Sequence, residues 1–381
     1  MQNFTFYNPV KIIFGKGTIA RLGAEASKAG KHALLVYGGG SIKNNGVYMT
    51  VMIALEAAGI AVTEHSGVKP NPVLSHVREG VKKAKEAGCD MVIAAGGGSV
   101  IDEAKAIAAG AGYEGDLWDF FLGKDGIKSA LPLFTVLTIP ATGSEMNSGC
   151  VITNEETKQK FSAMSSALFP KASILDPEAT MTLPTAQVAY GAVDGLAHLI
   201  EGYFSTTDKD VAITDELVHA VARSIITSTD RILTDPKDYN ARASMMWSAT
   251  MALNGMQSLG YGGTSFVNHV IEHSLSAIYD IAHGAGLAIV MPAWFKYDLA
   301  KNGPARLEKF GAAVFGAKTA EGTIAAFEEW FGKIGAPTRL SQANIPAEDI
   351  PRIAENAMGL IKLWEIAYYQ PEIEEILEKA K

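Results

Sequence analysis

Apolar residues in the first half of the chain gather into short runs that alternate with longer amphipathic stretches. The stretches between these apolar runs have the periodicity of helices. In residues 73–87, for example, the charged positions fall opposite the Val and Ala positions. Alternation of strand and helix is typical of a doubly wound, mostly parallel α/β sheet. Residues 3–14 alternate with period two and predict a small additional hairpin. The runs that predict buried strands are 33–37, 60–65, 91–95, 133–139 and 172–175.

The pattern changes near residue 183, where the β-rich runs stop. Pro184 stands at the start of the next helical stretch, a position that tolerates proline. We therefore predict an α/β domain over residues 1–183 and an all-α domain over residues 184–381. The helices expected in the second domain begin with 185–202, 209–229, 240–258 and 264–281, and others follow to Lys381.

Composition agrees with two globular domains and excludes several functions. A chain of 381 residues is longer than one hydrophobic core usually supports, and 48% apolar with 19% charged residues is ordinary for a globular protein. The net charge of −8 disfavours nucleic acid or an anionic membrane as a partner. Cys89 and Cys150 alone provide no disulfide framework. With no signal-peptide pattern and no apolar run of membrane-spanning length, we expect a soluble cytoplasmic protein.

Two glycine-rich segments each lie between a predicted strand and a predicted helix: VYGGGSIKNNG at 36–46 and IAAGGGSVIDEAK at 93–105. Such turns let backbone amides approach a phosphate, and the following helix N-terminus adds positive potential. Ser41 and Ser99 add hydroxyl donors. Glycine also makes tight strand–helix turns without any ligand, so one loop alone leaves both interpretations open. Two loops at the carboxyl ends of parallel strands favour a nucleotide.

A third glycine segment, GKGTIA at 15–20, fits the dinucleotide fingerprint G-x-G-x-x-A. The full fingerprint requires an acidic residue about 20 positions later, at the end of the next strand. Because that strand ends here at Gly38, we set this match aside.

Three of the eight histidines fall within the segment NHVIEHSLSAIYDIAHG, residues 268–284. His269 and His273 are four residues apart and share one face of a helix, and Asp194 and His198 have the same spacing. A nitrogen and oxygen set of this kind suits a divalent transition metal such as iron(II) or zinc. The candidate ligands are Asp194, His198, His269 and His283.

Each of these histidines taken alone is equally compatible with a hydrogen-bonded core residue. The D-x3-H pair combined with the H-x3-H-x9-H cluster favours a metal site over that alternative. The remaining histidines stand singly among polar residues, which predicts surface positions for His32, His65, His76 and His219.

Taken together, these segments resemble the iron-containing (group III) alcohol dehydrogenases. The similarity runs in family order over essentially the whole chain: GGGS with Asp102 and Lys105, TIPATGSE at 138–145, VDGLAHLIEGY, and NHVIEHSLSAIYDIAHGAG. The chain is most similar to the butanol dehydrogenase and NADPH-dependent aldehyde reductase branch, in which TIPAT likewise departs from the more common TTAGT. The resemblance implies a dehydroquinate synthase-like architecture.

The resemblance also implies roles for individual residues. His273 would lie near the nicotinamide, with a proton-relay or hydride-positioning role. The metal ligands would be Asp194, His198, His269 and His283. The pyrophosphate loop and the start of its helix would be Gly97, Gly98, Ser99 and Asp102. Further cofactor contacts would be Thr138, Thr142, Lys160 and Asn147, the last at a position where many members carry threonine.

The implied activity is reversible reduction of aldehydes to primary alcohols by hydride transfer from a nicotinamide cofactor, with iron(II) or zinc polarising the oxygen. A lyase of the dehydroquinate synthase kind is an alternative. Its substrate carries carboxylate and phosphate, yet the ligand helices 185–202 and 264–281 contain no Lys or Arg. A metal-binding protein without catalysis is a third alternative, and it leaves the glycine loops unexplained.

Cofactor preference is predicted from Gly38. NAD-preferring relatives carry an aspartate there, which binds the adenosine ribose and repels a 2′-phosphate. Gly38, Gly39 and Gly40 leave room for the phosphate, Ser41 can donate to it, and Lys43 can reach it. A pocket that accepts either cofactor is the alternative; we predict preference for NADP(H).

The resemblance further suggests a homodimer. We expect the strands at 3–7 or 10–14 to pair across a two-fold axis, because an exposed edge strand needs covering.

Overall fold

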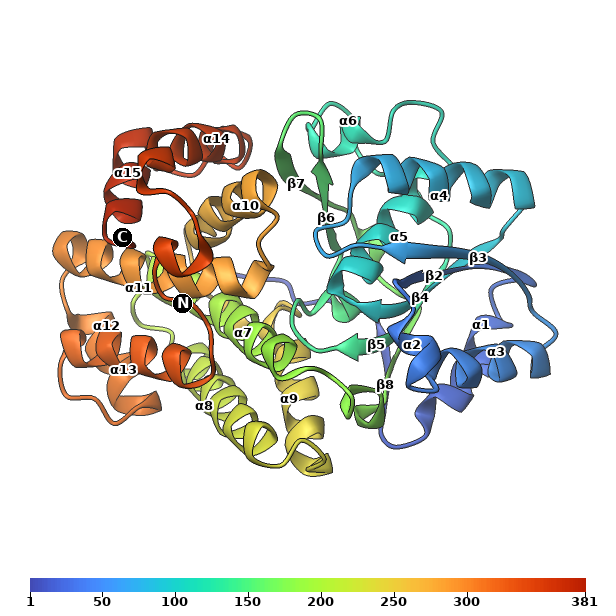
Figure 1. The fold of residues 1–381 in the computed structure, drawn as a ribbon, viewed down its shortest axis with the longest axis horizontal. Coiled ribbons are helices and arrows are strands. Elements are labelled where there is room, and N and C mark those ends of the chain that lie inside the picture. Colours follow the sequence, from blue (N-terminus) through green and yellow to red (C-terminus); the bar gives the residue numbers. More distant parts are fainter. The chain divides into compact units, whose positions relative to one another are not determined.

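Six parallel strands form the central sheet of the first part of the chain (Figure 1). The computed structural model describes residues 1–381, and the strand order is β1-β8-β5-β4-β2-β3. All neighbouring pairs in this sheet run parallel, and the five predicted strand runs are confirmed. The strands are β1 Lys11–Phe14, β2 His32–Gly38, β3 Ala61–Val68, β4 Met91–Gly97, β5 Leu133–Ile139 and β8 Ala172–Leu175.

The predicted amino-terminal hairpin is wrong. Residues 3–10 form no strand, and β1 pairs in parallel with β8, with Lys11 opposite Ala172. Because all four residues of β8 are buried, β1 covers an edge that would otherwise be open. The hairpin that does occur was not predicted: β6 Gly149–Asn154 pairs antiparallel with β7 Gln159–Met164.

Helices cover both faces of the sheet, as a doubly wound fold requires. In Figure 1, α1 and α3 lie on one face, whereas α4 and α5 lie on the other. The helices of this part are α1 Leu22–Ala26, α2 Ser41–Asn44, α3 Val47–Ala57, α4 Leu74–Ala87, α5 Gly98–Gly110 and α6 Trp118–Phe121. Short 3-10 turns are η1 Thr18–Arg21, η2 Ser144–Met146, η3 Ser166–Leu168 and η4 Pro177–Thr180.

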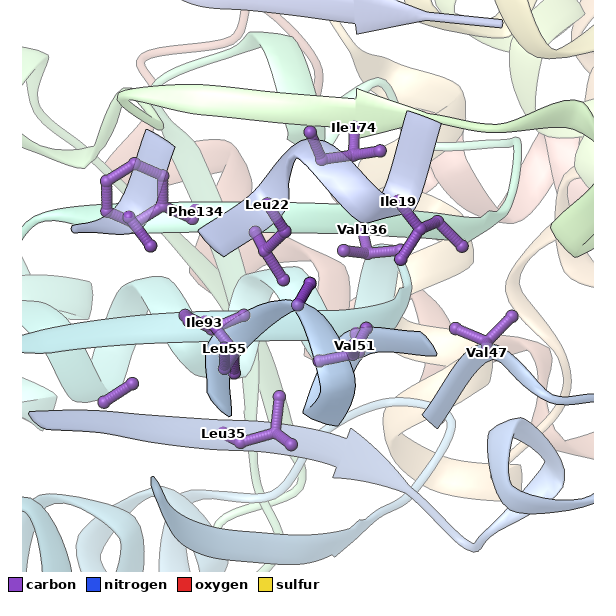
Figure 2. Close-up of a cluster of buried hydrophobic side chains, with 14 of the residues drawn as sticks. Ile19, Leu22, Leu35, Val47, Val51, Leu55, Ile93, Phe134, Val136 and Ile174 are labelled. Atoms are coloured by element: carbon purple, nitrogen blue, oxygen red, sulfur yellow. The ribbon is translucent and has the colours of Figure 1, made fainter. Parts of the chain in front are cut away.

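One face of the sheet carries the hydrophobic cluster of Figure 2. Leu35 of β2, Ile93 of β4 and Val136 of β5 pack with Leu22 of α1 and Val51 of α3, and all five are fully buried. Alternate residues of a strand face the same side, which explains why every second position of β2 and β4 belongs to this cluster. Each such side chain contributes about 1.5–3 kcal/mol on burial. This buried cluster stabilises the sheet, whose carboxyl edge carries the glycine loops.

The order of the strands reverses between β2 and β4. The chain continues from β2 outward to β3, and from β4 in the opposite direction to β5. Ligands of open parallel sheets bind at such a switch point, outside the carboxyl ends of the strands. The loops that begin at Gly38 and Gly97 follow these two central strands. Both predicted glycine loops therefore border the switch point.

Beyond Leu175 the chain forms helices only, as predicted. None of these helices combines the length and apolar character that a membrane span requires. They are α7 Thr185–Ser205, α8 Ala212–Thr234, α9 Tyr239–Ala252, α10 Val267–Tyr279, α11 His283–Asn302, α12 Ala305–Val314, α13 Ala320–Lys333, α14 Ile350–Leu363 and α15 Gln370–Glu378. The 3-10 turns are η5 Met256–Ser258, η6 Leu340–Ala343 and η7 Ala347–Asp349.

The chain divides into two compact units. The α/β unit comprises Tyr7–Leu183 and Pro236–Thr250, and the helical unit comprises Met1–Phe6, Pro184–Asp235 and Met251–Lys381. These units differ from the predicted single division at residue 183 in two segments, 1–6 and 236–250.

Specific contacts explain both exceptions. In the helical unit the Met1 ammonium pairs with Asp208, and the Gln2 amide donates to the Gly260 carbonyl at 2.9 Å. In the α/β unit the Trp247 ring of α9 lies 6.2 Å from that of Phe14 in an edge-on contact. Such contacts join residues far apart in sequence, so local periodicity does not reveal them.

Candidate metal centre and cofactor loops

Three helices bring one aspartate and three histidines together in the helical unit. Asp194 and His198 lie one turn apart on α7, His269 lies on α10, and His283 is the first residue of α11. The Nε2 atoms of His198, His269 and His283 lie 3.5, 3.7 and 3.6 Å from Asp194 Oδ1. The three histidine nitrogens thus surround Asp194 Oδ1. Asp194, His198 and His269 form one group of potential metal ligands, and His283 also belongs to a second group with Glu272 and His273.

These distances fit a single metal ion. Zinc holds histidine nitrogen and carboxylate oxygen at about 2.0–2.2 Å, so two ligand atoms at the tetrahedral angle lie about 3.4 Å apart. Asp194 Oδ1 and His269 Nε2 are buried and have no hydrogen-bond partner. A buried polar atom left in this state costs about 1–3 kcal/mol, and a divalent cation would satisfy both atoms. The donor set therefore fits a transition metal.

Two further carboxylates orient the histidine rings. Glu201 Oε1 lies 3.0 Å from Nδ1 of His269 and also accepts the backbone N–H of His269 at 2.8 Å. The Glu272 carboxylate is hydrogen-bonded to Nδ1 of His283. With Nδ1 turned to the glutamate, Nε2 is the nitrogen of each ring that is directed towards Asp194 and that a metal would take, as in carboxylate–histidine–metal triads.

The sequence reasoning missed Glu201 and Glu272, although helical spacing carries a signal for both. Glu201 follows Asp194 by two turns of α7, and Glu272 follows His269 by three residues of α10. Both carboxylates are fully buried, which is rare for glutamate unless a partner compensates the charge.

Burial and neighbouring charges set the protonation of the cluster. Burial lowers the pKa of His198 to about 4, so this ring is neutral at pH 7 and its lone pair is free to bind a metal. Burial also disfavours the charged form of His269, but the Asp194 and Glu201 carboxylates outweigh it and raise the pKa to about 9. Burial opposes ionisation of Asp194, yet the adjacent histidines hold its pKa well below the usual range. A metal must therefore displace a proton from His269.

His273 lies beside this cluster, one turn after His269 on α10. Its buried ring is 5.7 Å from that of His283 and 6.3 Å from that of Trp364, measured between centroids. His273 also belongs to a group of three residues whose potential metal-ligating atoms lie within 4.8 Å of one another; the other two are Glu272 and His283. The structure thus places a further histidine next to the histidines that are predicted to bind the metal.

The second predicted site lies at the carboxyl edge of the sheet. Gly97 ends β4 and Gly98 begins α5, so the unpaired amides of the first turn of this helix face the switch point. A Cβ atom on Gly98 would lie 2.3 Å from Thr142 Cγ2. Glycine is therefore required where the α5 turn meets the loop after β5, and two predicted cofactor residues, Gly98 and Thr142, are in contact.

Asp102 of α5 holds the loop that follows β5. Its carboxylate accepts the Ser144 hydroxyl at 2.6 Å and the Val151 amide at 3.0 Å. Lys105 Nζ, one turn later, donates to both oxygens of Asn147 at 2.9 and 3.0 Å. Because desolvation penalises its charge, the pKa of Lys105 falls to about 8. These contacts give Asp102 and Lys105 a positioning role and occupy the side-chain oxygen of Asn147.

The remaining predicted contacts occupy different environments. Thr138 is buried near the end of β5, and Ser99 is half-buried in the first turn of α5. Lys160 of β7 is buried, and its ammonium donates to Asn71 Oδ1 at 2.9 Å.

The loop after β2 has open space where the prediction requires it. A Cβ atom added to Gly39 or Gly40 would meet no other atom within 4 Å, and one on Gly38 would meet the Val68 carbonyl at 3.4 Å. Gly40 has a φ of 108°, a conformation that favours glycine.

Lys43 of α2 is engaged within this loop region. Its ammonium lies 5.0 Å from the Tyr37 ring centroid, 4.6 Å from that of Tyr48 and 3.6 Å from Glu64 Oε2. Glu64 also accepts hydrogen bonds from both tyrosine hydroxyls. Glu64 therefore neutralises much of the positive charge that Lys43 would offer to a ligand.

The predicted surface positions are wrong for most of the other histidines. His65 and His219 are buried, and His76 is partly buried. His65 and His76 both contact Glu103, whereas Nε2 of His219 lies 3.2 Å from the Tyr203 hydroxyl. His219 in fact stands among apolar neighbours on α8, and the burial of His65 and His76 arises from contacts between separate elements.

Comparison with known proteins gives matches over the whole length. Residues 9–177 match the family described as iron-containing alcohol dehydrogenase, and residues 188–381 match the carboxyl-terminal part of the Fe-containing alcohol dehydrogenase family. The chain is 45% identical to the probable NADH-dependent butanol dehydrogenase 1 of Bacillus subtilis, over 94% of each chain. It is 37% identical to the NADPH-dependent aldehyde reductase YqhD of Escherichia coli, over 93% of this chain and 92% of that protein.

Solved structures agree with these matches. The NADH-dependent butanol dehydrogenase A of Thermotoga maritima superposes with a TM-score of 0.96 at 49% identity, covering 100% of this chain and 99% of the other. The structure of YqhD from Escherichia coli K-12 gives a TM-score of 0.93 at 34% identity, with the same coverage.

Proposed function

The chain belongs to the iron-containing alcohol dehydrogenase family, and from this membership we propose that it reversibly reduces aldehydes to primary alcohols with a nicotinamide cofactor. The observation that carries the proposal is the convergence of three histidine Nε2 atoms at 3.5–3.7 Å from Asp194 Oδ1. A cluster with this spacing is suited to hold a metal, whereas a hydrogen-bonded histidine core would have shorter contacts.

We assign Asp194, His198, His269 and His283 as the residues that hold the metal. When bound, a divalent ion supplies positive charge that stabilises the negative charge developing on the aldehyde oxygen during hydride transfer. Three neutral imidazoles and one carboxylate leave a net positive charge for this purpose. Glu201 keeps the ligand ring of His269 in the required tautomer through its Nδ1 contact.

Reduction of an aldehyde consumes a hydride and a proton. We assign the role of proton donor to His273, whose buried ring lies 5.7 Å from that of His283, because histidine is the side chain that most often transfers protons in catalysis. The four ligand residues are less suited to this role, because their lone pairs are used by the metal.

We assign cofactor binding to the α/β unit. The amides and dipole at the start of α5 suit a pyrophosphate at Gly97, Gly98 and Ser99, and the switch point of the sheet is the usual position for a dinucleotide. Asp102 supports this site by holding the loop after β5 through Ser144. We assign Thr138, Thr142, Asn147 and Lys160 to the same site from the family resemblance.

For the cofactor we propose a preference for NADP(H). Gly38 carries no carboxylate to repel a 2′-phosphate, and the space at Gly39 and Gly40 is open. Because Glu64 pairs with Lys43, less positive charge is available to attract a 2′-phosphate, and this limits the preference. The named relatives include both NADH- and NADPH-dependent enzymes. A kcat/KM that is higher with NADH than with NADPH would overturn this proposal.

We also propose a homodimer. β1 is an end strand of the sheet, and its backbone has one unpaired edge to which a second copy can add. Residues 3–7 form no strand, which leaves residues 11–14 as the candidate. Light scattering that gives the 40.4 kDa of one chain would contradict the dimer.

Removal and return of the metal tests the proposed function. Protein stripped with a chelator should not consume NADPH with butanal as substrate, and iron(II) or zinc should restore the reaction. The His269→Ala variant should remain inactive after metal is returned. Aldehyde-dependent consumption that survives both metal removal and this substitution would refute a metal-dependent reductase.

A further inference from the structure

A second cluster of histidine and carboxylate side chains lies in the α/β unit. His65 comes from β3, His76 from α4 and Glu103 from α5. Glu103 Oε1 lies 3.0 Å from His65 Nε2 and 2.7 Å from His76 Nδ1, and the two rings stack with centroids 4.2 Å apart. One strand and two helices thus aim three potential metal ligands at one point.

The carboxylate of this cluster is under-compensated. The Glu103 side chain is fully buried and that of His65 is 2% exposed. Burying a carboxylate is costly unless other groups balance its charge, and its two hydrogen-bond partners are the imidazoles of His65 and His76. Both rings contact the same oxygen, and Glu103 Oε2 is buried without any hydrogen-bond partner. The imidazoles therefore satisfy only half of the carboxylate.

A divalent cation would compensate this charge with little movement. Around zinc, two ligand atoms lie about 3.4 Å apart at the tetrahedral angle, so each nitrogen–oxygen pair needs to open by less than about 1 Å. His76 is 22% exposed, which gives an ion and its water ligand a route to the cluster.

We propose that His65, His76 and Glu103 form a second divalent metal site in this chain. Two imidazoles and one carboxylate favour zinc, or a similar late first-row ion, over magnesium or calcium. The ligands join the edge strand β3 to α4 and α5. The bound ion stabilises the α/β unit by linking these three elements.

Zinc stoichiometry in matched variants tests the site. Stripped protein is titrated with zinc, excess ion is removed, and bound metal is measured by mass spectrometry. The wild-type chain should retain two ions, and His76→Gln and His269→Ala should each retain one. The double variant should retain none. Since glutamine can still donate to Glu103, His76→Gln tests metal binding more than folding. The matched control is His32→Gln, which replaces a half-buried histidine of the same unit that contacts Thr63. This control should retain two zinc ions.

A second measurement keeps the test independent of folding defects. Zinc should raise the melting temperature of His269→Ala, in which only the second site remains, and should leave that of the double variant unchanged. One ion per wild-type chain, lost in His269→Ala and kept in His76→Gln, would overturn the second site and leave the proposed function intact. One ion lost in His76→Gln and kept in His269→Ala would support the second site and refute the metal centre of the helical unit.

Discussion

Both histidine–carboxylate clusters of this protein have a central carboxylate, but the helical-unit cluster also has carboxylates behind its histidine rings. In the helical unit, Glu201 and Glu272 lie behind the rings of His269 and His283 and contact Nδ1, so Nε2 of each ring remains directed towards Asp194. In the α/β unit, the Glu103 carboxylate lies between two rings and contacts both.

We expect the distance between the central carboxylate and the ring nitrogens to decide how tightly each cluster binds metal. In the helical unit, the three histidine nitrogens lie 3.5–3.7 Å from Asp194 Oδ1, which is close to the separation that a metal imposes on two of its ligand atoms. Contacts of 2.7 and 3.0 Å have the length of hydrogen bonds, and a metal must open them. We therefore expect the helical-unit cluster to bind metal more tightly, and the following experiments test that contrast.

Substitution of a ligand in the helical unit should have the largest effect. We expect His269→Ala or His283→Ala to lose the metal of this unit and to lower turnover at least about 10³-fold, because several kcal/mol of charge stabilisation disappear. Metal analysis and steady-state NADPH oxidation measure both effects. His76→Gln, in the other cluster, should retain most activity. Turnover that falls equally in His76→Gln and His269→Ala would contradict the division of roles.

His273→Ala should separate catalysis from metal binding within one helix. The variant should keep its metal while kcat falls about 10²-fold, the usual contribution of a positioned proton donor. His269→Ala, one turn away, is the internal comparison. Loss of metal in His273→Ala would show that this histidine is a ligand, and the proton role would be withdrawn.

Glu201→Gln tests the carboxylate behind the ring. Glutamine can still accept a hydrogen bond but carries no charge, so metal affinity should fall by about 10–100-fold. Competition with a zinc chelator measures the affinity, and kcat at saturating metal should stay within a fewfold of wild type. An unchanged affinity would mean that the hydrogen bond to His269 is sufficient and that the charge of Glu201 does not strengthen metal binding.

The smallest expected effect concerns the loop after β2. Gly38→Asp introduces a carboxylate near the site proposed for the 2′-phosphate and should shift the ratio of kcat/KM for NADPH over NADH by about tenfold towards NADH, equivalent to roughly 1.4 kcal/mol. The Val68 carbonyl at 3.4 Å from the new Cβ leaves room for the substitution. A ratio that does not change would place the 2′-phosphate elsewhere.

The features that could be predicted from the sequence are those that local periodicity determines. The spacing of four residues predicted that Asp194 and His198 share one helix face. The apolar runs and their glycine turns predicted the strands of the sheet and the two loops at its carboxyl edge. These features depend on residues that are neighbours along one element.

The missed features depend on contacts between elements. His65, His76 and Glu103 come from three elements with no common period, so the sequence predicts surface positions for the two histidines and carries no signal that joins them to Glu103. The same limit explains the missed pairing of β1 with β8 and the segment 236–250, which packs with the α/β unit. The contacts at these places depend on how the surfaces of separate elements fit together, and the sequence of one element alone does not reveal that fit.

Anomalous diffraction from crystals of zinc-loaded protein, at wavelengths on either side of the zinc absorption edge, tests the central metal assignment most directly. The assignment predicts a peak in the helical unit bonded at about 2.0–2.2 Å to Asp194 and to Nε2 of His198, His269 and His283. The absence of any peak there, or a peak bonded to Glu272, His273 and His283 in its place, would contradict it.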